Sequence, residues 1–179
     1  RSTQWSSSAA SDVYKRRALF IPSPTTERRI YLPVGHYEKG VIITAPNLVI
    51  YDAPKFLFSI LSSRMHKLWI QTVGGKLKTD IRYSSELCYN TFPLPEINKE
   101  NKKVLTELSL RVLVDEREKH FEKTISELYD PDKMPKGLLN LHQEIDIIVE
   151  KCYQSKPFLN DEELSLIHIY EPTRQSLIS

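Results

Sequence analysis

The sequence predicts an α+β fold, in which a small β-rich module with one long helix is followed by an α-helical hairpin module. Short runs rich in Val, Ile, Leu and Tyr, broken by Pro and Gly, fill residues 16–53. Apolar residues recur at three- to five-residue steps over residues 55–73, and helical periodicity returns after residue 98. The charge is divided in a similar way, with 13 Lys/Arg against 6 Asp/Glu in residues 1–92 and 12 against 17 in residues 93–179. A basic half joined to an acidic half suggests that the first half meets a polyanion, although chance segregation explains the totals equally well.

The β-rich module is expected to follow a polar, Ser-rich loop or disordered end at residues 1–13. Four short strands then occupy RRALFIP, RRIYLPVGH, GVIIT and NLVIYDA, each bounded by turn residues. SPTTE is a plausible hairpin connection between the first two runs. The prolines at positions 22, 24 and 33 place these strands at the edges or ends of a sheet, because proline cannot donate a ladder hydrogen bond.

Residues 55–73 predict one amphipathic helix of about five turns. Pro54 suits its first turn, and Gly74–Gly75 is expected to end it. Its apolar face comprises Leu57, Leu61, Met65, Leu68 and Val73.

The period falls to two after the glycine pair, which predicts a single strand over residues 76–83. One face of this strand would carry Leu77, Thr79, Ile81 and Tyr83. The opposite face would carry Lys76, Lys78, Asp80 and Arg82. The four charged side chains are therefore expected to project in the same direction.

The helical module is expected to begin after the linker FPLPEI, whose two prolines stop a helix or strand. Long helices are predicted at residues 99–121 and 138–153, with a short helical turn in ISELYDPDKMP between them. Two amphipathic helices of this length pack as an antiparallel hairpin. The predicted organisation is thus a loop at 1–13, one module at 14–95, a helical domain at 96–163 and a tail at 164–179.

Several classes of protein are disfavoured by what the sequence lacks. There is no nucleotide-binding glycine motif, no nucleophile elbow and no paired carboxylates suited to acid–base catalysis. Cys88 and Cys152 lie far apart and are expected to be ordinary thiols, and the five histidines show no metal-ligand spacing and are expected at the surface or at helix boundaries. No apolar run is long enough to span a membrane. We expect no metal, no cofactor and no catalytic residue in these 179 residues.

The alternating charges at 76–82 can read DNA or form an ordinary solvated face. A lysine donates to guanine O6 and N7, and an aspartate accepts from cytosine N4, so Lys78 and Asp80 could read the two sides of one G·C pair. Lys76, Arg82, Arg28 and Arg29 are then candidates for phosphate contacts. Spacing alone favours the solvated face, because charge alternation on exposed strands is common.

A joint pattern of motifs resembles one family. RRIYLPVGH is followed by GKLKTDIRYS, YNTFP and LYDPDKMP, which is the order found near the C-terminus of large single-chain adenine-N6 DNA methyltransferases of the type IIG/IIL restriction-modification group. The resemblance covers residues 17–161 and implies a target-recognition domain followed by a C-terminal helical domain. It also implies that Lys78 and Asp80 read bases, that the neighbouring Arg82 faces the DNA, and that Lys78 with Asp80 selects G where a Glu/Arg pair selects C.

The resemblance further implies double-stranded DNA as partner, the upstream methyltransferase domain of the same chain as a second partner, and a prokaryotic cytoplasmic location. S-adenosylmethionine would be the cofactor of the intact parent, because the family's cofactor and adenine-binding motifs lie upstream of these residues. Arg1 in place of Met makes us expect a piece of a longer protein, and LSLIHIYEPTRQSLIS at 164–179 resembles translated sequencing adapter. The alternative hypothesis is a protein-interaction module that docks through the acidic hairpin, and it would be favoured by exposure of Leu105, Leu108, Val112 or Leu141.

Overall fold

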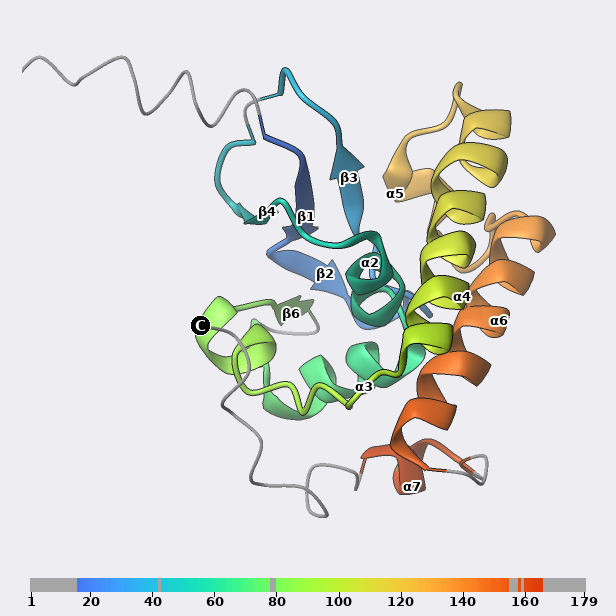
Figure 1. Cartoon of the computed structure of the whole chain (residues 1–179). Helices are drawn as coiled ribbons and strands as arrows, with labels where there is room; N and C mark the ends of the chain where they lie inside the picture. The colour runs from blue at the N-terminus through green and yellow to red at the C-terminus, as the bar shows by residue number, and fades with distance from the viewer. Residues whose placement is uncertain (1–15, 42, 78–79, 155–157, 159, 166–179) are drawn as a thin grey trace, which may run out of the picture.

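The computed structural model describes residues 16–41, 43–77, 80–154, 158 and 160–165 as two small antiparallel sheets packed against helices (Figure 1). In the first sheet, β1 (Ala18–Pro22) lies between β3 (Gly35–Tyr37) and β4 (Asn47–Tyr51). In the second sheet, β6 (Asp80–Arg82) lies between β2 (Pro24–Thr26) and β5 (Gly75–Leu77). The mixed α+β class is as expected from the sequence.

The strands differ from the expected four runs. RRIYLPVGH contributes only β3, because most of its length is an irregular segment in which Tyr31, Leu32 and Val34 are nonetheless buried. The described residues of 40–44 form no strand, and SPTTE, expected as a connection, supplies β2. Apolar composition predicts burial here, but pairing with β6, which lies more than fifty residues away in the chain, decides which segment becomes a strand.

The long helix predicted at 55–73 is two helices, α2 (Lys55–Leu61) and α3 (Arg64–Val73). Ser62 and Ser63 separate them: the Ser63 hydroxyl donates to the Ile60 carbonyl and accepts from the backbone N–H of His66, so it caps the second helix. Serine is common at helix starts because its hydroxyl accepts a hydrogen bond from a free backbone N–H of the first turn. The same hydroxyl also bonds to nearby carbonyls, which interrupts a continuous helix.

The single strand predicted at 76–83 is a β-hairpin. Strands β5 and β6 pair antiparallel, with Gly75 opposite Arg82 and Leu77 opposite Asp80. Lys78 and Thr79, which join the two strands in the sequence, lie outside the described residues. A short π-helical segment, η1 (Ser85–Tyr89), follows the hairpin.

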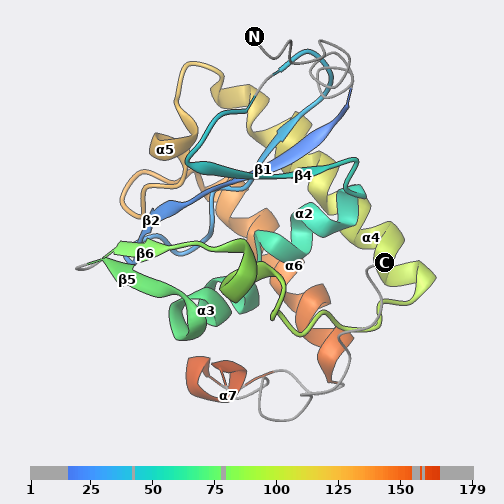
Figure 2. The ribbon, with the colours of Figure 1, turned by 90° about the vertical axis from the view of Figure 1, so that its left-hand side faces the viewer.

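The helical part agrees with the predicted antiparallel hairpin (Figures 1 and 2). Helix α4 (Lys99–Leu110) continues through the π-helical η2 (Arg111–Glu116) into a 3₁₀ turn, η3 (Glu118–His120). The short α5 (Ile125–Leu128) precedes α6 (Lys136–Tyr153), and α7 (Asp161–Ser165) ends the described chain.

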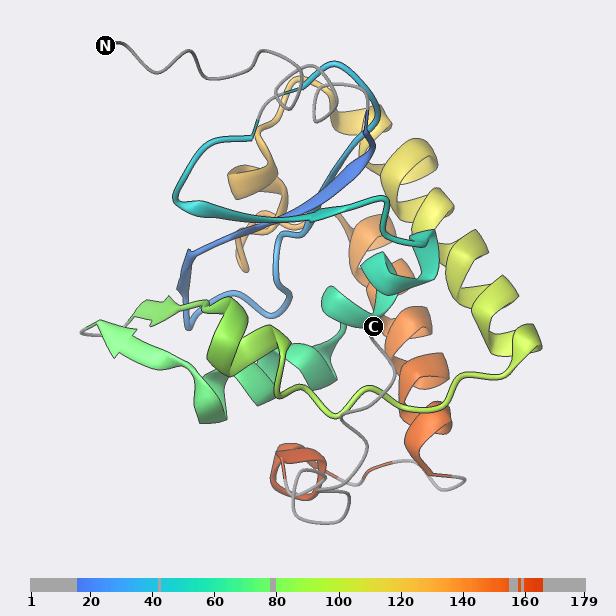
Figure 3. The same ribbon diagram turned by 60° about the vertical axis from the view of Figure 1, so that its left-hand side comes forward.

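One hydrophobic core spans both parts of the chain. Helix α2 packs against α4 and α6, and α3 also packs against α6, so the sheets and the helical hairpin share α2 and α3 as a common layer (Figure 3). Leu19 and Phe58 from the first part and Leu105, Leu138 and Ile145 from the second belong to the same buried cluster. The two predicted modules therefore support each other and do not have separate cores.

A buried polar network also joins the two parts. The Asp146 carboxylate on α6 accepts from the Tyr31 hydroxyl at 2.7 Å and from the backbone N–H of Arg64 at 2.8 Å. Next to it, His142 stacks on Tyr31 with 4.5 Å between ring centroids, and its Nε2 is 2.7 Å from the Tyr129 hydroxyl. His142 is fully buried in the interior of α6 and lies neither at the surface nor at a helix boundary as expected, and burial lowers its pKa to about 3.

Gly74 ends α3, as predicted, but through close packing and not through a left-handed conformation. Its φ is −70°, and a Cβ built there would lie 2.3 Å from the Ile70 carbonyl oxygen and 3.1 Å from a methyl group of Ile81. Among the described residues, apart from Gly75 itself and its chain neighbours, no atom lies within 4 Å of a Cβ built at the adjacent Gly75.

We expect Gly74→Ala to lower the free energy of unfolding by about 1–3 kcal/mol, because the added methyl overlaps backbone. Gly75→Ala is the matched control and should change it by less than about 0.5 kcal/mol. Urea denaturation of the three proteins measures both effects. Equal stability of the two variants would show that the α3–β5 junction accommodates a side chain.

No helix within the described residues is long and apolar enough to cross a membrane.

Candidate nucleic-acid interface

Strand β6 presents two charged side chains to solvent on either side of a buried residue. Asp80 and Arg82 are exposed, while Ile81 between them is 1% exposed and Tyr83 after them is 2% exposed. Same-side residues of a strand lie about 6–7 Å apart, a spacing compatible with neighbouring bases or phosphates. The predicted projection of Asp80 and Arg82 away from the core is thus present, and their base-reading role stays a prediction.

The register of the sheet defines which neighbours share the outer face. Thr26 lies opposite Asp80 on one side, and Pro24 lies opposite Arg82. Directly opposed residues in antiparallel strands point to the same face, so these pairs form two rows across the sheet.

The single strand on which four charges were expected to share one face is a hairpin in the structure. Lys76 lies opposite Ile81 in the register and not opposite Asp80 or Arg82. The hairpin is the cause, because the chain reverses direction between residues 77 and 80. Lys78 lies outside the described residues, so its predicted partnership with Asp80 stays a prediction.

Two residues of α3 hold the second sheet in place: one bonds to β2, and the other bonds to the residue that follows β6. Lys67 is only 3% exposed, and its Nζ donates to the Thr26 carbonyl at 3.2 Å. Burial is the main cause that lowers the pKa of Lys67 to about 8, while nearby Glu27 raises it and Arg29 lowers it further.

His66 is the second of these residues and is fully buried in the first turn of α3, which agrees with a position at a helix boundary. Its Nε2 is 3.0 Å from the Tyr83 hydroxyl, and its ring meets the Phe92 ring edge-on at 4.5 Å. Burial lowers its pKa to about 3. These contacts fasten the segment after β6 to α3.

The sequence interpretation missed Lys67 as a contributor to this site. Its position three residues before the buried Ile70 places it on the inner face of α3, which is the only pattern that points to it.

Arg28 and Arg29, predicted to contact phosphates, lie in the loop after β2. The Arg28 guanidinium pairs with Asp132 at 2.9 Å, and both side chains are 74% exposed, so this ion pair is weak and open to solvent. Arg29 is half-buried and donates to the Ser126 hydroxyl at 2.8 Å. The loop is thereby tied to α5 and the turn after it, and Arg28 keeps most of its surface available.

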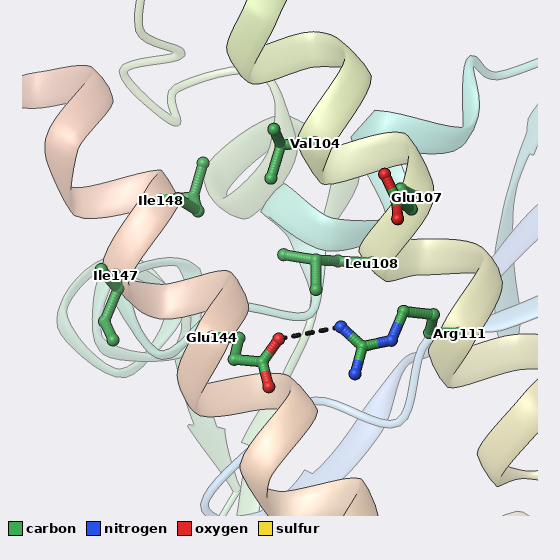
Figure 4. Close-up of a pocket in the computed structure, with 7 residues that line it drawn as sticks. All are labelled: Val104, Glu107, Leu108, Arg111, Glu144, Ile147 and Ile148. Carbon is green, nitrogen blue, oxygen red and sulfur yellow. Dashed lines mark hydrogen bonds and ion pairs between the residues drawn. The ribbon is translucent and has the colours of Figure 1, made fainter.

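A shallow groove of about 290 Å³ lies between α4 and α6 (Figure 4). Val104, Leu108 and Ile148 line it, and the ion pair of Arg111 with Glu144, at 3.0 Å, crosses one end. This is the surface that the interaction hypothesis concerns.

The apolar residues whose exposure would favour that hypothesis are buried. Leu105 and Val112 are completely inaccessible, and Leu108 and Leu141 are 5% and 6% exposed. The stripe of the helical hairpin therefore faces α2 and the core of the chain itself.

Within the described residues, no group of three or more His, Cys, Asp or Glu side chains could hold a metal ion. Both cysteines are free thiols.

Comparison with known proteins gives concordant matches for both parts of the chain. The family model of the MmeI target recognition domain matches residues 3–96, and that of the MmeI C-terminal domain matches residues 97–177. DNA methyltransferase A of Bacillus subtilis (strain 168) is 44% identical over 146 residues, which is 82% of this chain and 16% of that protein.

A solved structure matches as well. The type IIL restriction-modification enzyme MmeI in complex with DNA superimposes with a TM-score of 0.80 at 32% identity, over 86% of this chain and 20% of the enzyme. The chain thus spans a fifth or less of the length of these two proteins. Because the first family model covers more than half of the residues, the chain belongs to the MmeI target recognition domain family, and its second part matches the MmeI C-terminal domain.

Proposed function

We propose that this chain recognises a short sequence in double-stranded DNA, as the specificity part of a longer restriction-modification methyltransferase. The observation that carries the proposal is the exposed pair Asp80 and Arg82 on the central strand of a sheet in a target recognition domain. The related MmeI enzyme was solved in complex with DNA, which supports the same class of ligand here.

In this proposal each charged residue has a distinct role. Lys78 and Asp80 read the two sides of one G·C pair by donating to guanine and accepting from cytosine. Arg82 contacts the base pair next to this one. Phosphate contacts, which position the protein without reading sequence, come from Arg28, Arg29 and Lys76.

The longer protein supplies the chemistry. An upstream methyltransferase domain would bind S-adenosylmethionine and methylate an adenine at N6 after flipping it out of the duplex. The chain described here would place that domain on its target, in the cytoplasm of a prokaryote.

The experiment that tests sequence recognition uses the 179-residue chain and a pool of duplexes with a randomised central segment. Sequencing of the bound fraction after repeated selection should reveal one enriched sequence. Enrichment of no sequence, by a protein whose circular dichroism shows it to be folded, would contradict the proposal.

Phosphate contact makes a separate quantitative prediction. The logarithm of the binding constant for the selected duplex should fall linearly with the logarithm of salt concentration, with a slope of about −0.9 for each phosphate contacted. Arg28→Gln should make the slope less steep by about 0.9, because one contact is lost. The control is Lys103→Gln on the exposed side of α4, which removes the same charge away from the hairpin and should leave the slope unchanged. An identical slope in all three proteins would remove Arg28 from the interface.

A further inference from the structure

We propose that Lys67 is a positioning residue for DNA recognition. Its buried ammonium group holds the carbonyl of Thr26, where strand β2 ends and the loop with Arg28 and Arg29, here called the basic loop, begins. The inference rests on the proposed function, and it assigns a role to a residue that cannot itself reach DNA.

The first support is the place of the hydrogen bond. Lys67 Nζ donates to the carbonyl oxygen of Thr26, the last residue of β2. Thr26 lies opposite Asp80 in the sheet, so it is the cross-strand neighbour of the predicted base reader. A shift of Thr26 would move the outer end of the row that contains Asp80.

The second support is that the same carbonyl begins the basic loop. The backbone N–H of Arg29 donates to Thr26 O at 3.3 Å, which closes the turn that carries Arg28. The Thr26 hydroxyl accepts from the Arg28 backbone N–H, also at 3.3 Å. Thr26 therefore neighbours both the candidate base reader and the candidate phosphate contacts, and Lys67 bonds to its carbonyl.

The third support is energetic. An ammonium is costly to bury, and an apolar side chain of similar length, such as methionine, would fill the same space without that cost. The charge of Glu27 favours the buried ammonium, and that of Arg29 opposes it. The hydrogen bond to Thr26, and not packing, therefore accounts for a lysine at this position.

The accessibility of Lys67 separates positioning from direct contact. Only 3% of the residue is exposed, so the side chain can form no phosphate or base contact in this conformation. Its loss should then alter discrimination between sequences and leave the number of phosphate contacts unchanged. A direct phosphate contact would produce the reverse pattern.

The experiment compares Lys67→Met, which removes the charge and the donor, with Lys67→Arg, which keeps both. Each 179-residue protein is titrated with the duplex selected by the unaltered chain and with a scrambled duplex of the same composition, at several salt concentrations. Lys67→Met should reduce the ratio of the two affinities by about tenfold with an unchanged salt slope, as expected when one base contact is misplaced. Lys67→Arg should retain a larger ratio than Lys67→Met. Lys103→Met, at an exposed position on α4, is the matched control and should leave ratio and slope unaltered.

Three results would overturn the inference. An unchanged affinity ratio in folded Lys67→Met would show that Asp80 is positioned without it. A slope less steep by about 0.9 would identify a phosphate contact instead. Equal losses in the Met and Arg variants would show that only the shape of the side chain matters.

Unfolding of the variant and failure of the proposed function can each be told apart from failure of the inference. If thermal melts show Lys67→Met to be unfolded, Lys67→Gln, which keeps an N–H donor without the charge, takes its place and should give an intermediate ratio. Selection of no sequence by the unaltered chain would defeat the proposed function itself, whereas selection that survives Lys67→Met defeats only the role of Lys67.

Discussion

Replacing Asp146 by alanine should lower the free energy of unfolding by about 3 kcal/mol, among the largest single-residue effects that the fold predicts. The carboxylate accepts from the Tyr31 hydroxyl and from the backbone N–H of Arg64, and all three groups meet beneath the surface. Alanine leaves both donors without their partner. Each buried unsatisfied group costs about 1–3 kcal/mol, and the vacated volume adds to the loss.

Loss of Asp146 should destabilise both parts of the chain, because its contacts join them. The residue lies on α6, Tyr31 lies in the segment before β3, and Arg64 begins α3, so the three contacts connect the helical part to the recognition part. Asp115→Ala removes an exposed carboxylate from η2 and should change stability by less than about 0.5 kcal/mol. Chemical denaturation at pH 7 measures both variants. A loss below about 1 kcal/mol for Asp146→Ala would show that water or a neighbour replaces the carboxylate.

The pH dependence of Asp146 provides an independent check. Burial is the largest cause that raises the pKa of Asp146 to about 7, against the opposing effects of its hydrogen bonds, and nearby Glu150 raises it while Arg64 lowers it. Between the unfolded pKa of about 3.9 and pH 7, the folded protein holds a proton that the unfolded chain has released. The contribution of this group to stability is therefore full below about pH 4 and falls as the pH rises to 7.

Asp146→Asn isolates that contribution, because an amide resembles the protonated acid and does not titrate. Stability relative to the unaltered protein should increase for Asp146→Asn as the pH rises from 4 to 7. The difference between the two proteins is the quantity to measure, since His66 and His142, with lowered pKa values, destabilise the fold as the pH falls below 6.5. A difference that does not change with pH would mean that Asp146 is ionised throughout.

Helical periodicity was sufficient to predict the helical part. The expected helices at 99–121 and 138–153 correspond to the segment from α4 to η3 and to α6, because each buries a regular apolar stripe. The same criterion failed at residues 62–63, where the apolar period runs through two serines that interrupt the backbone. Periodicity reports which face is buried and does not report local competition for backbone hydrogen bonds.

The β5–β6 hairpin could not be predicted from the alternating pattern of residues 76–82. Alternation of charged and uncharged residues continues from Lys76 to Arg82 without a break, and Lys78–Thr79 has none of the Gly, Asn or Asp residues typical of a two-residue turn. A continuous strand would place residues 76 and 80 on one face. Pairing of residue 77 with Asp80 changes that relation, and only the register reveals it.

Buried polar residues were the least predictable feature of the site. Lys67, His66 and Asp146 belong to no sequence motif. Each is buried because it hydrogen-bonds to a residue from another segment of the chain: Thr26, Tyr83 and Tyr31, respectively. Asp80 and Arg82, in contrast, were predictable because strand alternation places them outside whenever Ile81 and Tyr83 are inside.

The exchange of one recognised base pair is the largest effect on function that the proposal predicts. Lys78→Glu combined with Asp80→Arg should replace G by C at one position of the selected sequence and leave the other positions unchanged. A carboxylate at residue 78 can accept from cytosine N4, and a guanidinium at residue 80 can donate to guanine O6 and N7, so the two sides of the pair are interchanged. Each well-formed contact discriminates by about 1–3 kcal/mol, which corresponds to a preference of roughly 5- to 150-fold for the new base pair over the old one.

The single substitutions and a matched exchange decide whether these two residues read the base. Asp80 is exposed on the strand, so Asp80→Ala should relax the selected base at that position without unfolding the chain. Lys103→Glu with Glu107→Lys interchanges the same charges on exposed positions of α4 and should select the original sequence. If the double variant at residues 78 and 80 also selects the original sequence, the hairpin does not read that base pair. If it selects nothing while remaining folded, the two residues support binding but do not specify it, because charge reversal has then weakened every sequence alike.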